Sequence, residues 1–313
     1  MVNIIKYSSS KRREWNDFLT GSKNGTFLFN RDYVEYHGER FTDFSLMVYD
    51  GGELIALLPA NIDSDQLVSH GGLSFGGFIV DSRMKVSIML KIFNELIKLM
   101  QAENINKLIY KKIPYIYHSI PSDEDLYALS KINARLTRRD VSSTIYFRNI
   151  IPFQKNRIRA IKKAEHMDIG ARESEDFSSF WRILQSNLWL KHNKYPVHSL
   201  DEIIYLRNKF PRNIRLFASH KDDVMIAGVV VYESSNVAHV QYIASDPNNN
   251  IKGSLDIILS YIIKKYSSEK TYFDFGISTE NNGIYLNEGL AFFKEGFGAR
   301  AVVHDFYEVD INE

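Results

Sequence analysis

The sequence has 313 residues, with 39 Lys and Arg against 38 Asp and Glu, and it contains no cysteine. This length suffices for two ordinary domains, and the balanced charge argues against a general attraction to nucleic acid or to an anionic membrane. The lack of cysteine excludes disulfides, thiolate metal sites and a cysteine nucleophile. No apolar run approaches the ~18 residues of a membrane-spanning helix, and the first residues lack the apolar core of a signal peptide, so we expect a cytoplasmic protein.

The first half of the chain predicts a hairpin, two further extended segments, a helix and a closing strand. A turn at 50–52 joins the two strands of the hairpin. The helix is expected at 86–100, where apolar residues recur at spacings of three and four. The expected strands are residues 44–49, 53–60, 66–69, 78–80 and 107–110.

The second half repeats this order, with a single extended segment between the hairpin and the helix. A turn is expected at 220–223 and a helix at 255–266, and the expected strands are residues 214–219, 224–232, 238–244 and 271–275. A helix that joins two strands of one sheet implies that these strands are parallel. We therefore predict a duplicated architecture with a boundary near 149–152, where Pro152 disfavours helix just before it.

A strongly basic helix is predicted directly after this boundary, at 155–166. Its first nine residues hold five cations and no acid, and Lys155, Arg159 and Lys163 share one face because they are four residues apart. Like charges at this spacing repel one another, and a phosphate group or an RNA backbone would relieve the repulsion. Arg159 and Lys163 are therefore candidate substrate-binding residues; the alternative is a solvated cationic face.

The last forty residues hold the strongest candidates for chemistry. Asp274 lies at the end of a predicted strand, and Lys294 follows two phenylalanines and precedes Phe297. A lysine that is half-sheltered by apolar neighbours suits a site where a cation meets an anion or a developing oxyanion; alternatively it lies on the surface with its stem on apolar groups. Asp274 could accept a proton or brace the following loop, and Tyr242 and His304 are further candidates for proton transfer.

Other catalytic motifs are weak or missing. Gly72 to Gly76, around Ser74, matches the hydrolase pattern Gly-x-Ser-x-Gly, but that pattern needs a helix directly after the serine, and Gly76-Gly77 begins a helix poorly. A glycine-rich strand edge, along which a ligand can lie, fits better. No nucleotide-binding glycine motif and no metal-ligand spacing of histidines is present, so no metal is expected. An aromatic and leucine stripe predicts a buried helix face: Phe180, Trp181, Leu184, Leu188 and Trp189.

Residues 152–307 resemble a GNAT-superfamily acyltransferase of the Fem-like (aminoacyl/peptidyl transferase-like) two-domain branch, because the strand end at 273–276 and the segment 293–299 occur in the same order and spacing. The resemblance implies an α/β (α+β) fold of tandem GNAT-like (acyl-CoA N-acyltransferase) domains, with mixed sheets and flanking helices. Residues 1–150 would form the acceptor-binding domain and residues 151–313 the donor-binding domain.

The resemblance also assigns roles to particular residues. Lys294 and Phe293 occupy the place of a donor-site lysine and the aromatic before it, and Ser74 and Phe75 fall where such proteins hold the acceptor. In GNAT enzymes the pyrophosphate of coenzyme A binds at the start of the helix predicted here at 255–266. The cofactor candidates there are Asn250, Lys252, Gly253 and Ser254, although only the glycine of the usual pattern is kept and Leu255 is bulky where a small residue is expected.

The reaction that the resemblance implies is N-acyl transfer by direct attack of a primary amine on an acyl-CoA thioester. The acceptor would be a bacterial cell-envelope precursor, either an amino sugar or a sugar nucleotide. One alternative is an aminoacyl-tRNA-dependent transferase that acts on a peptidoglycan precursor. Another is a catalytically inactive, ligand-binding relative. tRNA is thus a possible partner, whereas DNA is not expected.

Overall fold

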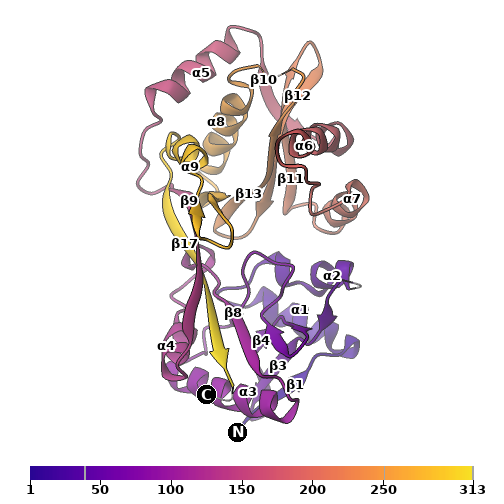
Figure 1. The fold of residues 1–313 in the computed structure, drawn as a ribbon, viewed down its shortest axis with the longest axis vertical. Helices are drawn as coiled ribbons and strands as arrows, with labels where there is room; N and C mark the ends of the chain where they lie inside the picture. Colours follow the sequence, from indigo (N-terminus) through magenta and orange to yellow (C-terminus); the bar gives the residue numbers. More distant parts are fainter. Residues whose placement is uncertain (39, 250, 312–313) are drawn as a thin grey trace. The chain divides into compact units, whose positions relative to one another are not determined.

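The computed structural model describes residues 1–38, 40–249 and 251–311, and the chain divides into two compact units (Figure 1). Unit 1 comprises residues 1–141, 281–285 and 303–313, and unit 2 comprises residues 142–280 and 286–302. The predicted domains, 1–150 and 151–313, overlap most of these units. The chain leaves unit 1 within β9 (Arg135–Tyr146), however, and most of the last strand, β17 (Arg300–Asp310), belongs to unit 1.

Unit 1 contains two sets of paired strands. One is an antiparallel sheet in the order β1-β3-β4-β7, formed by Val2–Lys6, Leu46–Asp50, Glu53–Leu58 and Ile79–Val80. In the other, β2 (Thr42–Asp43), β5 (Asn61–Asp63), β6 (Gln66–Val68), β8 (Lys107–Lys111) and the end of β17 lie in the order β2-β5-β6-β8-β17. β6 and β8 are parallel, as predicted for strands that a helix connects.

The helices of unit 1 are α1 (Arg12–Thr20), α2 (Arg31–Val34), α3 (Val86–Ala102) and α4 (Glu124–Lys131), with short 3-10 segments at Ser9–Lys11, Phe27–Phe29, Glu35–His37 and Tyr115–Tyr117. The predicted helix at 86–100 corresponds to α3. Its buried residues, Met89, Ile92, Phe93, Leu96 and Met100, recur at three and four and face the core that the strands also line. The periodicity of the sequence therefore placed this helix correctly.

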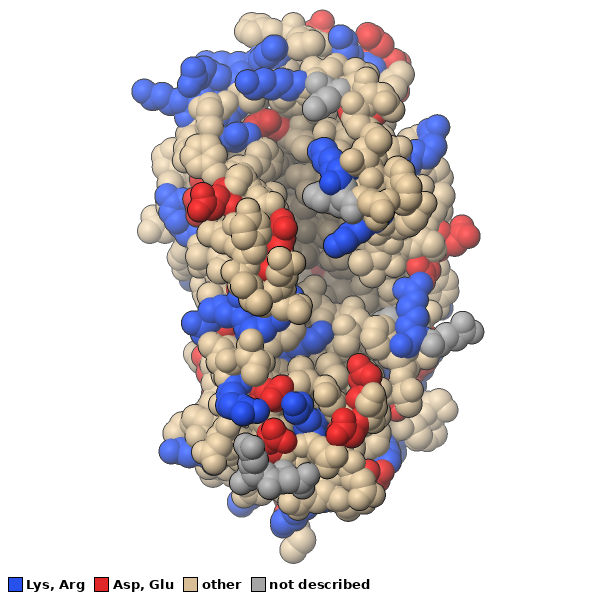
Figure 2. All heavy atoms as spheres, in the orientation of Figure 1, with Lys and Arg blue, Asp and Glu red and all other residues tan. Residues whose placement is uncertain are grey.

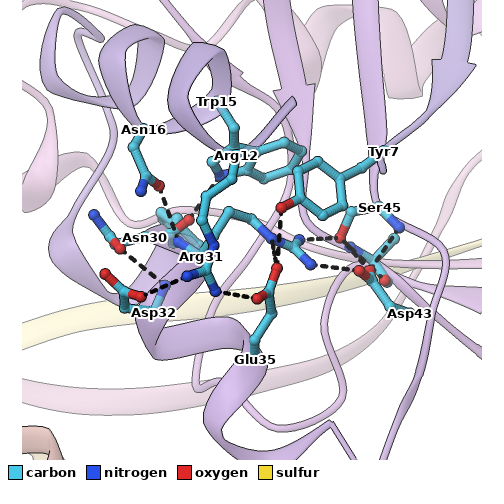
Figure 3. A network of polar contacts seen from close by, with 12 residues as sticks. Tyr7, Arg12, Trp15, Asn16, Asn30, Arg31, Asp32, Glu35, Asp43 and Ser45 are labelled. Atoms are coloured by element: carbon cyan, nitrogen blue, oxygen red, sulfur yellow. Dashed lines mark hydrogen bonds and ion pairs between the residues drawn. The ribbon is translucent and has the colours of Figure 1, made fainter. Parts of the chain in front are cut away.

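A buried arginine organises the polar interior of unit 1 (Figure 3). Arg31, at the start of α2, donates to Glu35 at 2.9 Å, to Ser45 at 3.0 Å and to Asp43. Its guanidinium carbon lies 3.7 Å from the ring centre of Tyr7. Because a buried charge is costly unless it is paired, these contacts fix α2 against β2, which carries Asp43, and against the connection to β3, which contains Ser45.

Unit 2 is built on one mixed sheet. Its strands are β10 (Gly170–Ser174), β11 (Ile214–Lys221), β12 (Val224–Glu233), β13 (Val237–Ser245), β14 (Tyr272–Ile277) and the end of β9, in that order. All neighbours are antiparallel except β13 and β14, which are parallel as predicted. β11 extends to Lys221, so the turn is narrower than expected and lies at Asp222–Asp223. The short strands β15 (Thr279–Glu280) and β16 (Tyr285–Leu286) follow.

The helices of unit 2 are α5 (Lys155–Glu165), α6 (Phe177–His192), α7 (Leu200–Lys209), α8 (Ser254–Tyr266) and α9 (Glu288–Glu295). α8 packs on one face of the sheet. Ala238 and Val240 of β13 and Phe273 and Phe275 of β14 share its hydrophobic cluster. α6 packs against β12 and β13. Phe180 of α6 lies so close to Gly228 of β12 that a Cβ at Gly228 would clash with its ring.

The predicted buried stripe on α6 is only partly correct. Phe180, Trp181 and Leu184 are buried, but Trp189 is half-exposed. The next inward position after Leu184 is taken by Asn187, whose buried side chain donates to the backbone carbonyl of Ser245 at 2.9 Å. Trp189 follows two residues later, about 200° further around the helix, and therefore points away from the sheet.

Candidate active site

The parallel strands β13 and β14 separate at the centre of unit 2. They pair only where Val237–His239 meets Tyr272–Asp274. β13 also carries a bulge, because Val230 pairs with Tyr242 and Val231 with Val240, which leaves Gln241 as an extra residue. Unpaired strand edges offer backbone N–H and C=O groups to a ligand. Figure 2 shows unit 2 hollowed over this part of the sheet, between the α9 side and the α6 side.

A histidine and a carboxylate meet where the two strands separate. Asp274 is fully buried, and one of its oxygens accepts hydrogen bonds from Ser142 and, at 2.8 Å, from Thr144. Its other oxygen lies 2.7 Å from Nδ1 of His239. When the N–H of the imidazole is at Nδ1 and forms a hydrogen bond to Asp274, Nε2 is unprotonated and can accept a proton. The side chain of His239 remains 18% exposed, so this pair can take up a proton in the manner of a general base.

Sequence reasoning found Asp274 but missed His239. The two residues are far apart in the chain, and only the pairing register of β13 with β14 brings them opposite one another. Their neighbours Ala238, Val240, Phe273 and Phe275 face α8. Because side chains alternate along a strand, His239 and Asp274 share the opposite face. The alternation could have been read from the sequence, whereas the register could not.

Lys294 belongs to α9, and its side chain reaches the end of β14. The sequence predicted that this side chain would be sheltered. It is 5% exposed, and its Nζ donates to the carbonyl oxygens of Gly276 at 2.8 Å and Ile277 at 2.7 Å. Burial lowers the pKa of Lys294 to about 8, and the negative charge of Asp274 partly opposes this change. An ammonium has three N–H donors, so one is left after these two carbonyls are satisfied.

The aromatic residues around Lys294 have different positions. Phe293 and Phe297 pack edge to face with ring centres 5.5 Å apart, and Arg157 of α5 lies 4.8 Å above the ring of Phe293. Phe292 is largely exposed, so it does not contribute to the shelter that the sequence suggested. Phe293 thus joins α9 to the basic helix α5.

Three of the residues predicted to bind phosphate, Arg159, Lys163 and Lys252, line one pocket between α5 and α8. It has a volume of about 480 Å³ and is lined by Asn156, Arg157, Arg159, Ala160, Lys163, Lys252 and Asp256. Gly253 caps the start of α8 with a φ of +100°, and a Cβ there would clash with the backbone oxygen of Ala160. The glycine therefore allows α5 to lie directly against the start of α8. Ser254 is buried, and Asn250 lies outside the described residues.

The pocket is net positive. Arg157 pairs with Asp256 at 2.9 Å, and burial raises the pKa of Asp256 although the charge of Arg157 opposes this. Among the residues that the structure describes, no carboxylate pairs with Arg159, Lys163 or Lys252. Figure 2 shows Lys and Arg gathered where Figure 1 places α5. The pocket can therefore hold an anion such as a phosphate group.

The remaining candidates belong to unit 1 or have another role in unit 2. The hydroxyl of Tyr242 contacts Nδ1 of His198, and burial raises the pKa of Tyr242 to about 12. His304 and Phe75 are buried together in unit 1, with ring centres 6.3 Å apart, and Ser74 is exposed in the same unit. The next helix after Ser74, α3, begins only at Val86, which excludes the hydrolase elbow.

Two classes of feature are missing from the described part of the chain. No group of three His, Asp or Glu side chains in residues 1–38, 40–249 and 251–311 could hold a metal ion. No helix formed by these described residues is long and apolar enough to cross a membrane.

Comparison with known proteins supports the predicted superfamily. Residues 153–285 match the model of the acetyltransferase (GNAT) domain family. No curated protein sequence matches the chain.

Solved structures share the fold across almost the whole chain. FemX has a TM-score of 0.67 at 11% identity, covering 97% of this chain and 96% of its own. The C-terminal domain of a protein described as a lysylphosphatidylglycerol synthetase, from Agrobacterium fabrum, has a TM-score of 0.65 at 10% identity, covering 96% and 91%. A tandem GNAT protein from the clavulanic acid biosynthesis pathway has a TM-score of 0.54 at 9% identity, covering 99% of both chains. The predictions of a GNAT-type acyltransferase and of the Fem-like tandem fold are confirmed.

Proposed function

We propose that this chain, whose residues 153–285 form a GNAT acetyltransferase domain, transfers an acyl group from acyl-coenzyme A to a primary amine by direct attack. The observation that carries the proposal is the pair of His239 and Asp274 at the point where β13 and β14 separate, next to the buried ammonium of Lys294. A base and a positive charge are the two groups that aminolysis of a thioester requires from a protein.

The chemistry can be assigned to atoms. The neutral amine attacks the thioester carbon, a C–N bond forms and the C–S bond breaks, and coenzyme A leaves as a thiolate, which then takes up a proton from the imidazolium of His239 or from water. Nε2 of His239 accepts the proton that the amine nitrogen loses, while Asp274 holds the imidazole and balances the charge that it gains. The remaining N–H of Lys294 stabilises the oxyanion of the tetrahedral intermediate. Asp274 thus acts through His239 rather than as the base itself.

The phosphates of coenzyme A would bind in the pocket between α5 and α8. Arg159, Lys163 and Lys252 supply three cations without carboxylate partners among the described residues, and the pocket lies at the start of α8. Positive charge and the partial positive end of a helix both favour a phosphate there. The ion pair of Arg157 with Asp256 would lie on one wall.

The acceptor is an amine of a cell-envelope precursor in this proposal. The fold is shared with a lysylphosphatidylglycerol synthetase domain, whose named product is a membrane lipid that carries an amino acid. This similarity supports the envelope as the setting, and an amino sugar or a sugar nucleotide remains the class of acceptor that we expect. A cytoplasmic location follows from such an acceptor.

A thiol-release assay tests the proposal. The purified protein would be incubated with acetyl-, succinyl- and longer acyl-CoA and a panel of amino sugars and their nucleotides. Because the chain has no cysteine, it contributes no background to a thiol reagent. His239→Gln should reduce release at least about 100-fold, whereas His166→Gln, at an exposed position outside the site, should not. Equal activity of both variants would remove His239 from the mechanism.

A second variant pair tests the pocket. Arg159→Ala combined with Lys163→Ala should raise the KM for acyl-CoA at least tenfold, because each phosphate contact is charge-assisted. The matched control is Lys85→Ala combined with Lys264→Ala, which removes the same charge from exposed positions outside the pocket. If both double variants have the wild-type KM, the cationic face of α5 is only solvated.

Aminoacyl-tRNA is a second candidate donor because the cationic surface extends beyond the pocket. Lys155 and Lys162 of α5 are exposed and do not line it, and RNA makes use of such an extended surface. Filter binding of aminoacyl-tRNA at increasing salt distinguishes the donors. A steep loss of tight binding with salt, with no thiol release from any acyl-CoA, would favour tRNA. Stabilisation by a ligand without turnover of either donor would indicate an inactive relative.

A further inference from the structure

The tip of α6 exposes a cluster of apolar side chains. We define the α6 tip as Trp189, Leu190, Tyr195 and Val197 with the two lysines between them, Lys191 and Lys194. The four apolar residues are 50%, 66%, 69% and 73% exposed, respectively. The rings of Trp189 and Tyr195 lie against each other, with centres 5.3 Å apart. Single exposed apolar residues are ordinary, whereas a contiguous cluster indicates an interaction site.

Hydrogen bonds fix the backbone around the α6 tip, so that its apolar side chains remain exposed to solvent. Asn193 ends α6 in the left-handed conformation, and its N–H bonds to the carbonyl of Trp189 at 3.0 Å. Trp181 donates from its indole to the carbonyl of His198 at 3.1 Å, and His198 also contacts the hydroxyl of Tyr242. Ser199 and Glu202 then form a capping box that starts α7. The exposure is therefore built into the fold.

The lysines decide which partner fits. Both Lys191 and Lys194 are exposed, and no carboxylate of the described residues pairs with either of them. Lysine is depleted from the centres of protein–protein interfaces, although Trp and Tyr are enriched there. Trp and Tyr interleaved with Lys are instead typical of segments at the boundary between lipid headgroups and acyl chains. Asp201, in the first turn of α7, is the nearest exposed acid in sequence and opposes this attraction.

We propose that the α6 tip docks unit 2 onto an anionic lipid bilayer. The aromatic and aliphatic side chains enter the headgroup region, and the two lysines contact lipid phosphates. This inference does not depend on the acyl-transfer chemistry. The tip is nevertheless linked to the candidate site, because Tyr242, which contacts His198 next to the tip, is on the same strand as His239.

The three tryptophans provide a specific readout. Trp15 and Trp181 are fully buried, and Trp189 is the third tryptophan of the chain. A blue shift of tryptophan emission on adding vesicles therefore reports on Trp189. We expect this shift, together with flotation of the full-length protein, with vesicles of phosphatidylcholine and 30% phosphatidylglycerol at low salt, and neither with pure phosphatidylcholine. Trp189→Phe should still float with the anionic vesicles but lose the blue shift.

Matched variants separate the tip from other basic surfaces. Lys191→Gln combined with Lys194→Gln should weaken binding to anionic vesicles about 30-fold, because each lysine near a charged surface contributes about fivefold. Trp189→Ser combined with Tyr195→Ser should abolish the binding. Lys85→Gln combined with Lys264→Gln removes the same charge elsewhere and should bind as the wild type does. All these positions are exposed, so the folded state should be retained, which a thermal melt checks.

Three results would overturn the proposal. The first is no flotation of the wild-type protein with anionic vesicles at low salt. The second is binding that Arg159→Ala and Lys163→Ala remove but the tip variants do not, since α5 would then be the docking surface. The third is a blue shift without vesicles that grows with protein concentration, accompanied by dimers in sedimentation, since a second copy of the chain would then cover the tip.

Discussion

Replacing Lys294 by Met should slow turnover strongly while leaving the protein folded. The ordinary lysine pKa of 10.5 falls to about 8, so keeping this ammonium charged in the folded state costs about 3 kcal/mol. Methionine removes that cost, but it leaves the carbonyls of Gly276 and Ile277 without their donors, at about 1–3 kcal/mol for each that stays dry. These opposing changes nearly cancel, so the free energy of unfolding should change by no more than about 2 kcal/mol. The loss of oxyanion stabilisation should lower kcat about 100- to 1,000-fold.

The dependence of the wild-type rate on pH provides the sharper test. If the charged ammonium stabilises the oxyanion, kcat should fall as the pH rises through about 8, where Lys294 loses its proton. Lys294→Arg keeps a charge at higher pH, so any residual activity of that variant should lack this alkaline limb. The thiol-release assay gives the rates, and urea unfolding gives the stability. A rate that rises through pH 8, or a Met variant within threefold of the wild-type rate, would refute the electrostatic role.

Two further predictions concern a strained glycine and a buried lysine. Gly253→Ala should destabilise unit 2 by about 1–3 kcal/mol in urea unfolding, because φ is +100° and a Cβ would clash with the oxygen of Ala160; wild-type stability would show that α5 can shift. Burial lowers the pKa of Lys111 to about 8, with Arg138 adding to the effect, so the unfolded chain binds a proton that the folded chain has released. The Lys111 contribution to stability should therefore rise by about 2 kcal/mol from about pH 7.5 to 9.5, and Lys111→Met should remove this rise; equal pH dependence in both proteins would contradict it.

The shelter of Lys294 in the segment 293–299 and the cationic face of the helix at 155–166 were predicted from local sequence patterns. Lys294, between aromatic residues, was expected to be sheltered, and it is buried against the end of β14. Arg159 and Lys163 were expected on one face because they are four residues apart, and they line the same pocket. Helical and strand periodicities act over a few residues, so such features can be read directly from the sequence.

The partner of Asp274 could not be read in this way. His239 reaches it only because β13 and β14 are paired in one particular register, and the register depends on how two distant segments pack. The position of Asp256 in the wall of the pocket could not be read from the sequence either, because it depends on the packing of α5 against the start of α8.

Trp189 shows how a local pattern can mislead. Its spacing from Phe180 and Leu184 predicted a buried stripe, yet Asn187 takes the inward position with a hydrogen bond to Ser245 and turns Trp189 outward. The order of strands and helices was thus encoded in short-range periodicity. The assembly of the candidate site, and the exposure of the α6 tip, were decided by long-range packing, because burial depends on which distant surface lies opposite each residue.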